Sequence, residues 1–176
     1  MAAGNTYVPI ATNTFSTTTA SVTFSSIPAT YTDLVLVISG LAYYSSSTFI
    51  VGDIVLNGDT GTNYSSTIIS AFNAATSSRY TSVPAMRQLF EMTANSTDNN
   101  LRSTGVMHFM NYANTTTYKT ALGRSGSVGS SAGSETIATA SVWRSTAAIN
   151  SIQIKNADSG TGFVAGTFSL YGIAAA

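Results

Sequence analysis

Short segments in which apolar and polar residues alternate recur along this chain. In the last of them, Phe168 and Leu170 fall on one side of an extended chain, and Ser169 and Tyr171 fall on the other. A period of two is typical of a strand that is buried on one face. The segment Gly162–Ile173 is therefore predicted to end in a core strand, and we expect the binding surfaces to lie elsewhere in the chain.

Other segments with a strand pattern follow at fairly even spacing, separated by turn signals. Pro9 cannot donate a hydrogen bond within a sheet, so it favours a sheet edge or the start of a strand for the first of these segments. The run from Asp33 to Ser39 is apolar without alternation, which predicts a strand that is covered on both faces. The predicted strands before the last one cover residues 5–15, 20–25, 33–39, 49–57, 64–72, 86–92, 105–112, 118–124, 135–143 and 149–155.

Polar segments are predicted to connect these strands. The stretch Asn57–Asp59 tolerates positive φ, so it predicts a tight hairpin turn from which residues 64–72 return as a strand. Residues 73–85 predict a long polar loop with room for one short helix, and the Gly/Ser-rich stretch 125–134 predicts a flexible loop. Residues 43–47 are expected to form a further connection.

Residues 5–15 are an arm or edge segment, and residues 86–92 are ambiguous between a strand and a helical turn and are assigned as strand because their neighbours are strands. Apart from these two segments, the pattern has about nine short strands and no amphipathic helix, which predicts an all-β fold. We expect a single-domain antiparallel β-sandwich. A jelly roll is the preferred topology, because the strand count is close to eight and several connections are long enough to cross between sheets. One domain is predicted to cover residues 1–176, with residues 1–18 as an N-terminal arm or edge strand.

Charged residues make up only 8% of the chain, and seven basic residues balance seven acidic ones. Globular proteins typically carry about 25% charged residues. In this chain Ser, Thr, Asn and Gly take the place of the missing charged residues. Affinity for nucleic acid comes mainly from clustered Lys and Arg, which this chain lacks, so no nucleic-acid partner is expected. A net charge near zero gives little repulsion between copies, which suits a protein that functions in an assembly.

The absence of other sequence features narrows the choice of functional class. Because there is no cysteine, disulfides and thiolate metal sites are excluded. The first nine residues do not form a signal-peptide pattern, and no apolar run approaches the roughly 18 residues of a membrane helix. We therefore expect a soluble protein that is synthesised in the cytoplasm of a host cell and has no membrane partner.

The single histidine, His108, alternates with Val106 and Met110 on one face of its predicted strand. A catalytic histidine needs a nucleophile or an orienting carboxylate, and the sequence identifies neither. A structural histidine is therefore the preferred interpretation, and a zinc site is discounted. The stretch 123–134 lacks the Gly-Lys-Ser/Thr ending of a phosphate-binding loop. No catalytic, cofactor-binding or metal-binding residue is predicted, no cofactor is expected, and the protein is predicted not to be an enzyme.

Oxygen-bearing side chains offer two weak candidates for chemistry. Asn57, Asp59 and Asn63 are spaced as at the start of a calcium loop, but an EF-hand needs a Glu at its twelfth position, where this chain has Ile68. The preferred interpretation is a hairpin turn, in which Asn, Gly and Asp are present because they adopt the backbone conformations that a turn requires. Asp53 and Asp59 would form a glycosidase pair only if the fold brings them together, and their spacing does not predict that it does.

Several aromatic residues are candidates for contact with a partner. Exposed aromatic rings stack on sugars or anchor a protein partner, whereas buried rings pack the core. For Trp143, packing in the core or between subunits is the preferred interpretation. The residues concerned are Tyr43, Tyr44, Tyr80, Tyr112, Tyr118 and Trp143.

A family resemblance is carried by framework strands and turns in the pieces Ile27–Val37, Leu56–Ser65, Ala140–Ile152 and Phe168–Ile173. Together these pieces resemble virion structural proteins of tailed phages, particularly those of cyanobacteria and other aquatic bacteria. The match spans most of the chain. Members of such families serve as capsid decoration or cement proteins, or as parts of tails and fibres, and the resemblance carries over no catalytic or ligand-binding residue.

The resemblance implies a bacteriophage capsid decoration or cement protein that stabilises the major capsid shell. Its partners would be the major capsid protein and copies of itself in a homotrimer, on the outer capsid surface of the virion. The alternative is a receptor-binding or carbohydrate-binding module of a tail fibre, in which Tyr43 and Tyr44 would contact the ligand. A polysaccharide-degrading enzyme is the third and least favoured class.

Overall fold

The computed structural model describes residues 6–44, 49–71, 74–93, 102–128, 134–157 and 162–174. These residues form strands and connecting turns and contain no helix, as the sequence predicts. In chain order, the strands are β1 (Tyr7–Phe15), β2 (Ser21–Phe24), β3 (Asp33–Tyr44), β4 (Phe49–Leu56), β5 (Tyr64–Ala71), β6 (Ala75–Val83), β7 (Met86–Thr93), β8 (Ser103–Met110), β9 (Lys119–Val128), β10 (Ser134–Trp143), β11 (Ile152–Asn156) and β12 (Gly162–Ile173).

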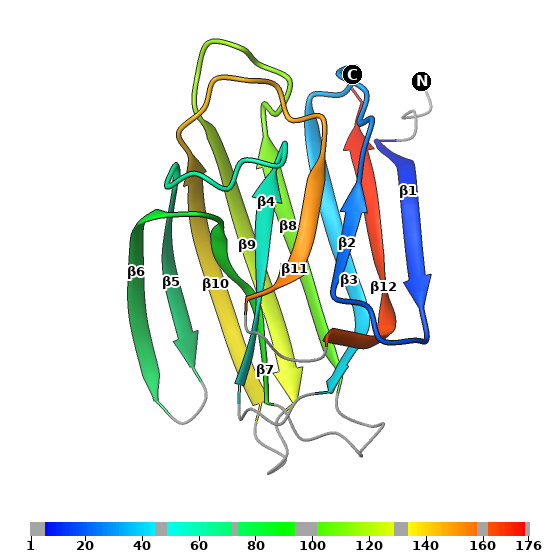
Figure 1. Ribbon diagram of the computed structural model, residues 1–176, viewed down its shortest axis with the longest axis vertical. Coiled ribbons are helices and arrows are strands. Elements are labelled where there is room, and N and C mark those ends of the chain that lie inside the picture. Colours follow the sequence, from blue (N-terminus) through cyan, green and yellow to red (C-terminus); the bar gives the residue numbers. More distant parts are fainter. Residues whose placement is uncertain are drawn as a thin grey trace.

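The strands build two sheets that pack face to face, and their pairings are antiparallel. The large sheet has eight strands in the order β1-β12-β3-β8-β9-β10-β5-β6, and the small sheet has four in the order β2-β11-β4-β7. Figure 1 shows the small sheet in front of the large one, with β5 and β6 lying beyond its edge. The predicted all-β antiparallel sandwich is confirmed.

The strand order is consistent with the predicted jelly roll. Without β5, β6, β9 and β10, the large sheet keeps the order β1-β12-β3-β8, beside the small sheet β2-β11-β4-β7. Successive strands of this reduced set alternate between the two sheets, except that β4 and β7 both lie in the small sheet as neighbours. This arrangement is consistent with a fold of eight strands and two Greek keys. The pairs β5–β6 and β9–β10 are additions that widen the large sheet alone.

Apolar side chains from the inner faces of the two sheets fill the space between them. Leu34 and Leu36 of β3 meet Ile54 of β4 and Ile152 of β11, and all four side chains are fully buried. Burying a side chain of this size contributes roughly 1.5–3 kcal/mol to folding. The core therefore lies where the small sheet covers the large one.

The closing strand β12 lies inside the large sheet, between β1 and β3. Phe168 and Leu170 are fully buried and Tyr171 is only half-buried, so the predicted alternation is confirmed. Gly172 lies directly against the ring of Tyr31, so close that a Cβ at this position would clash with the ring. β1 is an edge strand, as Pro9 favours, and residues 1–5 of the expected arm lie outside the described residues.

Three predicted connections are wrong, wholly or in part. Residues 75–83, predicted as loop, form the edge strand β6, because a strand without a covering layer can be polar on both faces. In the predicted loop 125–134, β9 continues to Val128 and β10 begins at Ser134, and residues 129–133 lie outside the described residues. In the predicted connection 43–47, β3 continues to Tyr44, and residues 45–48 are likewise outside the description.

The tight turn after β4 is confirmed, but the predicted hairpin is wrong. Asn57 (φ 53°) and Gly58 (φ 68°) both have positive φ, as an Asn-Gly turn requires. However, β4 belongs to the small sheet and β5 to the large one, so the two strands do not pair. Residues 57–63 instead cross the space between the two sheets, which is about 10 Å in packed sheets.

Candidate functional site

The large sheet has an outer face, formed by the side chains that point away from the small sheet. Exposed large hydrophobic side chains gather on it: Tyr7 is 57% exposed, Ile69 60%, Leu122 53% and Val128 44%. Ile69 and Leu122 point outward because their neighbours Ile68 and Ala121 are buried in the core. Of the large hydrophobic residues exposed in the described part of the chain, only Tyr118 lies outside the strands of this sheet.

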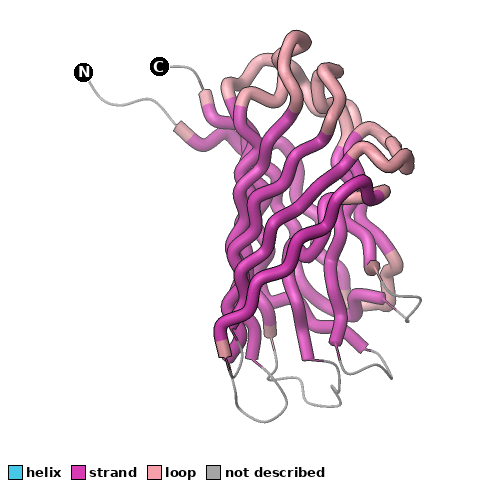
Figure 2. Tube along the Cα trace, turned by 90° about the vertical axis from the view of Figure 1, so that its left-hand side faces the viewer, coloured by secondary structure: helices cyan, strands magenta, loops and turns pink. Residues whose placement is uncertain are grey.

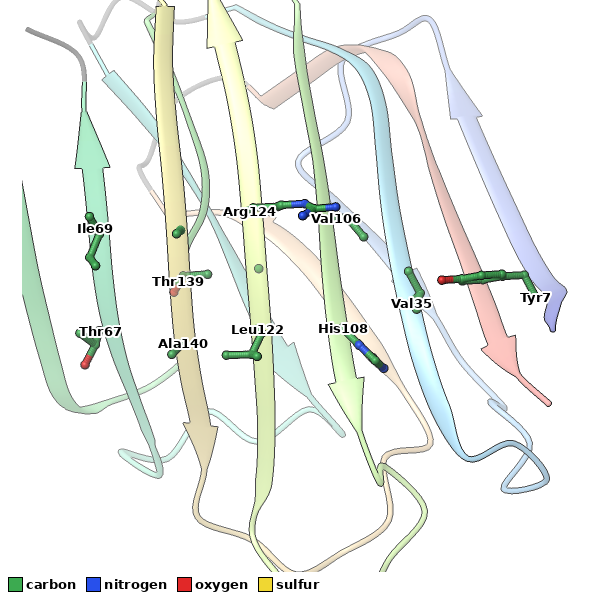
Figure 3. A pocket seen from close by; sticks show the side chains of 12 residues that line it. Tyr7, Val35, Thr67, Ile69, Val106, His108, Leu122, Arg124, Thr139 and Ala140 are labelled. Carbon is green, nitrogen blue, oxygen red and sulfur yellow. The ribbon is translucent and has the colours of Figure 1, made fainter. Parts of the chain in front are cut away.

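The centre of the outer face is hollowed. A hollow of about 610 Å³, here the central hollow, is lined mainly by apolar groups. Figure 3 shows Ile69 on β5 at one side of it and Tyr7 on β1 at the other. Two further hollows, of about 500 and 360 Å³, share lining residues with it, so the three form one continuous trough. The apolar lining of the central hollow consists of Val35, Ile69, Val106, Leu122, Ala138 and Ala140, with the ring of Tyr7.

The trough is apolar because some strands of the large sheet carry apolar side chains on both faces. In β3, Leu34 and Leu36 point into the core, while Val35 and Val37 point outward. Val35 is only 6% exposed although no described segment forms a layer over the outer face. Figure 2 shows the sandwich from the side, with its two layers of strands. The cover that the sequence predicts for both faces of β3 is therefore present only on the inner one.

Few charged groups lie on the outer face. His108 Nε2 is 3.0 Å from Asp33 Oδ2, and Asp33 Oδ1 accepts a hydrogen bond of 2.6 Å from the backbone N–H of Asn111. The carboxylate thus orients the imidazole at the border of the central hollow. Arg124 extends from β9 toward β8, and among the described residues its guanidinium has no ion pair. The central hollow therefore offers an apolar floor with the unpaired charge of Arg124, and Arg79 of β6 lines the adjoining hollow of about 360 Å³.

Comparison with known proteins gives no relative for this surface. No protein-family model, curated protein or solved structure matches the chain. No described helix is long and apolar enough to cross a membrane.

The candidate calcium loop is held together by its own hydrogen bonds. Asp59 Oδ1 accepts from the N–H of Gly61 at 2.8 Å, and Asp59 Oδ2 accepts from Trp143 Nε1 at 2.7 Å and from Asn63 Nδ2 at 2.9 Å. Asn57 Oδ1 accepts from the backbone N–H groups that follow Ile149. These oxygens are occupied by N–H donors, and the described residues contain no acidic or histidine cluster suited to a metal ion.

The hydrogen bonds and the burial of this loop shift the pKa values of Asp59 and Tyr64. The indole N–H of Trp143 is the main cause that lowers the pKa of Asp59 below its ordinary value, with smaller contributions from Asn63 and Gly61 and an opposing one from burial. Burial raises the pKa of Tyr64 to about 12, with a smaller contribution from the charge of Asp59 and an opposing one from the hydrogen bond that the Leu56 N–H donates to the hydroxyl. The Tyr64 hydroxyl also donates to the carbonyl oxygen of Asp59. Both groups stabilise the turn that crosses between the sheets.

The two aspartates of the glycosidase hypothesis have separate partners. Asp53 is buried on β4 and pairs with Arg87 of β7, whose Nη1 lies 2.7 Å from Asp53 Oδ2. The Arg87 guanidinium also lies over the ring of Tyr80, 5.8 Å from its centroid. Asp59 is bound by Trp143 and the crossing loop instead. The two carboxylates therefore belong to different hydrogen-bond networks.

The aromatic candidates separate into core and surface residues. Trp143 is 2% exposed and stacks on Tyr64 with ring centroids 6.2 Å apart, so the predicted packing role is confirmed. Tyr112 is buried and donates its hydroxyl to the carbonyl of Pro28, whereas Tyr118 is 57% exposed. The side chains of Tyr43 and Tyr44 lie outside the described residues.

Sequence reasoning placed His108 on the correct face but missed Asp33 and Arg124. Asp33 and His108 are 75 positions apart and meet only because β3 and β8 pair, with Val35 opposite His108. Arg124 shares the outer face with them because it lies opposite Val106 in the pairing of β8 and β9. The only local sequence pattern that pointed to the outer face was the apolar run of β3, which predicts that both faces of this strand are covered.

Proposed function

We propose that this protein is a bacteriophage virion structural protein, a capsid decoration or cement protein that stabilises the major capsid shell through protein–protein contacts. The observation that carries the proposal is the outer face, where exposed hydrophobic side chains surround an apolar trough with few charges. Monomeric proteins rarely expose large contiguous apolar patches, and such patches mark interaction sites. The resemblance to virion structural proteins supports the proposal that this interaction takes place in a phage virion.

The size of the outer face suits a stable protein–protein contact. Its eight strands are separated by seven spacings of about 4.8 Å, and at a length of roughly 25 Å they give an area of about 840 Å². This is close to the area of about 800 Å² that each partner buries in a standard interface. Interfaces that stay assembled are depleted in charge and more apolar than the remaining surface, as this face is.

The same face indicates the chemistry of its partner. An apolar surface that carries a carboxylate opposite Arg124 would fill the trough and pair the guanidinium. We assign this surface to the major capsid protein, with the decoration protein on the outside of the shell. The homotrimer that the resemblance implies would form on the shell and not in solution, and it would present three such faces to neighbouring shell subunits.

The test is binding to empty capsid shells by co-sedimentation. Leu122→Asp and Ile69→Asp would each place a carboxylate in the trough, and burying an unpaired charge in an apolar interface is costly. We expect each variant to weaken binding by at least about tenfold, equal to 1.4 kcal/mol. Thr23→Asp, on the exposed side of the small sheet, is the matched control and should bind as the unchanged protein does.

Two results would contradict the proposal. One is equal binding by the Leu122→Asp, Ile69→Asp and Thr23→Asp proteins, which would place the contact elsewhere. The other is a map of the intact virion in which the protein occupies fibre tips and is missing from the shell.

The second candidate function is a carbohydrate-binding module of a tail fibre. The observation in its favour is the central hollow, whose volume of about 610 Å³ and flanking Tyr7 ring would suit a short glycan. A glycan array decides between the two. Binding that Tyr7→Ala abolishes, together with no affinity for capsid shells, would favour the fibre module.

A further inference from the structure

The long edge of the large sheet formed by β6 is a second surface open to pairing. β6 is nine residues long and pairs only with β5, so one row of its backbone N–H and C=O groups has no strand beside it among the described residues. Seven of its nine residues are exposed and two are half-buried. A long exposed edge is a template for pairing with another chain, and natural sheets normally protect such edges.

The other sheet edges are protected or short. β1, at the opposite side of the large sheet, contains Pro9 and has a register shift between Pro9 and Ala11. β2, at one edge of the small sheet, is only four residues long. β7, at the other edge, packs over β9 and β10 of the large sheet. β1 is as long as β6 and also mostly exposed, but Pro9 and the register shift interrupt it, whereas β6 is long, exposed and free of proline.

β6 has few of the devices that block strand addition. It contains no proline, and its only charged residue is Arg79. Its pairing with β5 is regular from Ala75 to Thr81, and the register shift lies near its end, where Ser82 has a φ of 53°. Small Ser and Thr side chains cover both faces, so another strand could approach without steric conflict.

We propose that β6 pairs antiparallel with β6 of a second copy of this chain, joining the two large sheets into one continuous sheet. A twofold axis perpendicular to the sheet makes identical edge strands antiparallel, and twofold dimers are the commonest assemblies. The register centred on Ser78 sets Ser78 opposite itself and Arg79 opposite Ser77, which keeps the two guanidinium groups from lying directly opposite each other.

This pairing leaves the outer face free. Because the axis is perpendicular to the sheet, the outer faces of both copies lie on the same side of the joined sheet. The dimer would thus present two apolar troughs to one partner surface, which deepens the proposed function while using a different part of the molecule. The β6 contact itself does not depend on the proposed function.

The pairing is expected to be weak in dilute solution. An edge of nine residues buries less than the roughly 1,000 Å² of a stable interface, so the dimer should form only at high protein concentration. On a surface that holds many copies close together, the effective concentration is high enough to favour such a contact.

Sedimentation equilibrium of the full chain, from low micromolar to millimolar concentration, tests the pairing. We expect a monomer–dimer equilibrium. Ser78→Glu alone and Ser78→Lys alone should each shift it toward monomer, because like charges would meet at the axis, whereas an equal mixture of the two should restore the dimer. Restoration of the dimer in the mixture would show that both variants are folded and that each alone is monomeric because of charge repulsion at the β6 edge.

Cysteine cross-linking gives an independent measurement, since the chain contains no cysteine. Ser78→Cys should form a disulfide-linked dimer under mild oxidation, and Thr23→Cys, exposed on the small sheet, should not. A protein that stays monomeric at millimolar concentration, or a dimer that none of the Ser78 variants alters, would overturn the proposal.

Leu122→Asp distinguishes this inference from the proposed function. It should leave the β6 dimer intact while it weakens binding to capsid shells. If Leu122→Asp abolishes the dimer and Ser78→Glu does not, the copies meet through the outer face and the inference about β6 is wrong.

Discussion

Asp59 connects two separate parts of the molecule, the crossing loop and β10, through one carboxylate. Its oxygens accept hydrogen bonds from Trp143 on β10 and from Gly61 and Asn63 in the crossing loop. The sequence predicted a turn here, because Asn57 and Gly58 tolerate positive φ. It could not predict the bond to Trp143, which lies 84 positions away and is brought close by the pairing of β10 with β5.

Replacing Asp59 with Ala should destabilise the fold. The change leaves the indole N–H of Trp143, which is 2% exposed, without its acceptor, and a lost hydrogen bond to a charged group costs about 1.5–3 kcal/mol. Urea unfolding followed by Trp143 fluorescence measures the effect. Thr146→Ala, at an exposed position in the segment after β10, is the control and should change stability by less than about 0.5 kcal/mol. Equal stability of the Asp59→Ala protein would contradict this account of the loop.

The lowered pKa of Asp59 predicts how stability depends on pH. Because hydrogen bonds from Trp143, and less strongly from Asn63 and Gly61, favour the ionised carboxylate in the folded state, its contribution is present above the ordinary carboxyl pKa of 3.8. The contribution is lost as the pH falls through the lowered pKa of the folded protein. Acid titrations of unfolding should therefore show a smaller loss of stability for Asp59→Asn than for the unchanged chain. Parallel titration curves would argue against it.

At the scale of elements, the alternation of apolar and polar residues predicts the strands that have one buried apolar face. It does not predict strands whose two faces are both polar. β12 was predicted from Phe168 and Leu170, which are both fully buried. β6 was missed because no layer covers it, so nothing selects an apolar face. The end of β9 was missed because Ser125 and Ser127 point inward and are buried although they are polar. The assignment of β4 and β5 to different sheets depends on long-range pairing that the local pattern does not contain.

The contact between β12 and the segment before β3 can be tested at Gly172. A Cβ at this position would clash with the ring of Tyr31, so Gly172→Ala should cost about 1–3 kcal/mol, as overpacked sites do. Gly126→Ala in β9 is the matched control, because its Cβ would lie 3.8 Å from the nearest neighbouring atom, an ordinary contact distance. Thermal unfolding of both variants measures the difference. Equal unfolding midpoints for the two variants would show that the Tyr31 ring can move away from the added methyl group at little cost in stability.

At the scale of the whole molecule, the outer face is a property of the assembled sheet. Ile69, Leu122 and Val128 are ordinary exposed residues when each is taken alone, since folded proteins commonly expose single apolar side chains. They become a surface only because β5, β9 and β10 lie in adjacent positions of the large sheet. The sequence therefore predicted the sandwich and the side of β3 that needs cover, but not the trough.

The outer face should contribute little to folding. Ile69 and Leu122 are 60% and 53% exposed, so the double variant Ile69→Ser/Leu122→Ser removes little buried area and should change the free energy of unfolding by less than about 1 kcal/mol. It should, however, reduce the binding of a hydrophobic dye to the folded protein. A large loss of stability would mean that these side chains pack within the monomer. The contrasting control is Leu36→Ala, at a fully buried site, which should cost about 2–5 kcal/mol.

The pairing of β1 with β12 has a consequence for how the chain acquires its structure. These two strands are neighbours in the large sheet, with Tyr7 opposite Ile173, although almost the whole sequence separates them. β12 also separates β1 from β3, so the early strands cannot complete their sheet until the late strand has been synthesised. Folds dominated by such distant contacts form slowly, in milliseconds to seconds or longer. A growing chain must therefore keep β3 from aggregating until β12 has been synthesised, and its maturation would be sensitive to chaperones that bind apolar strands.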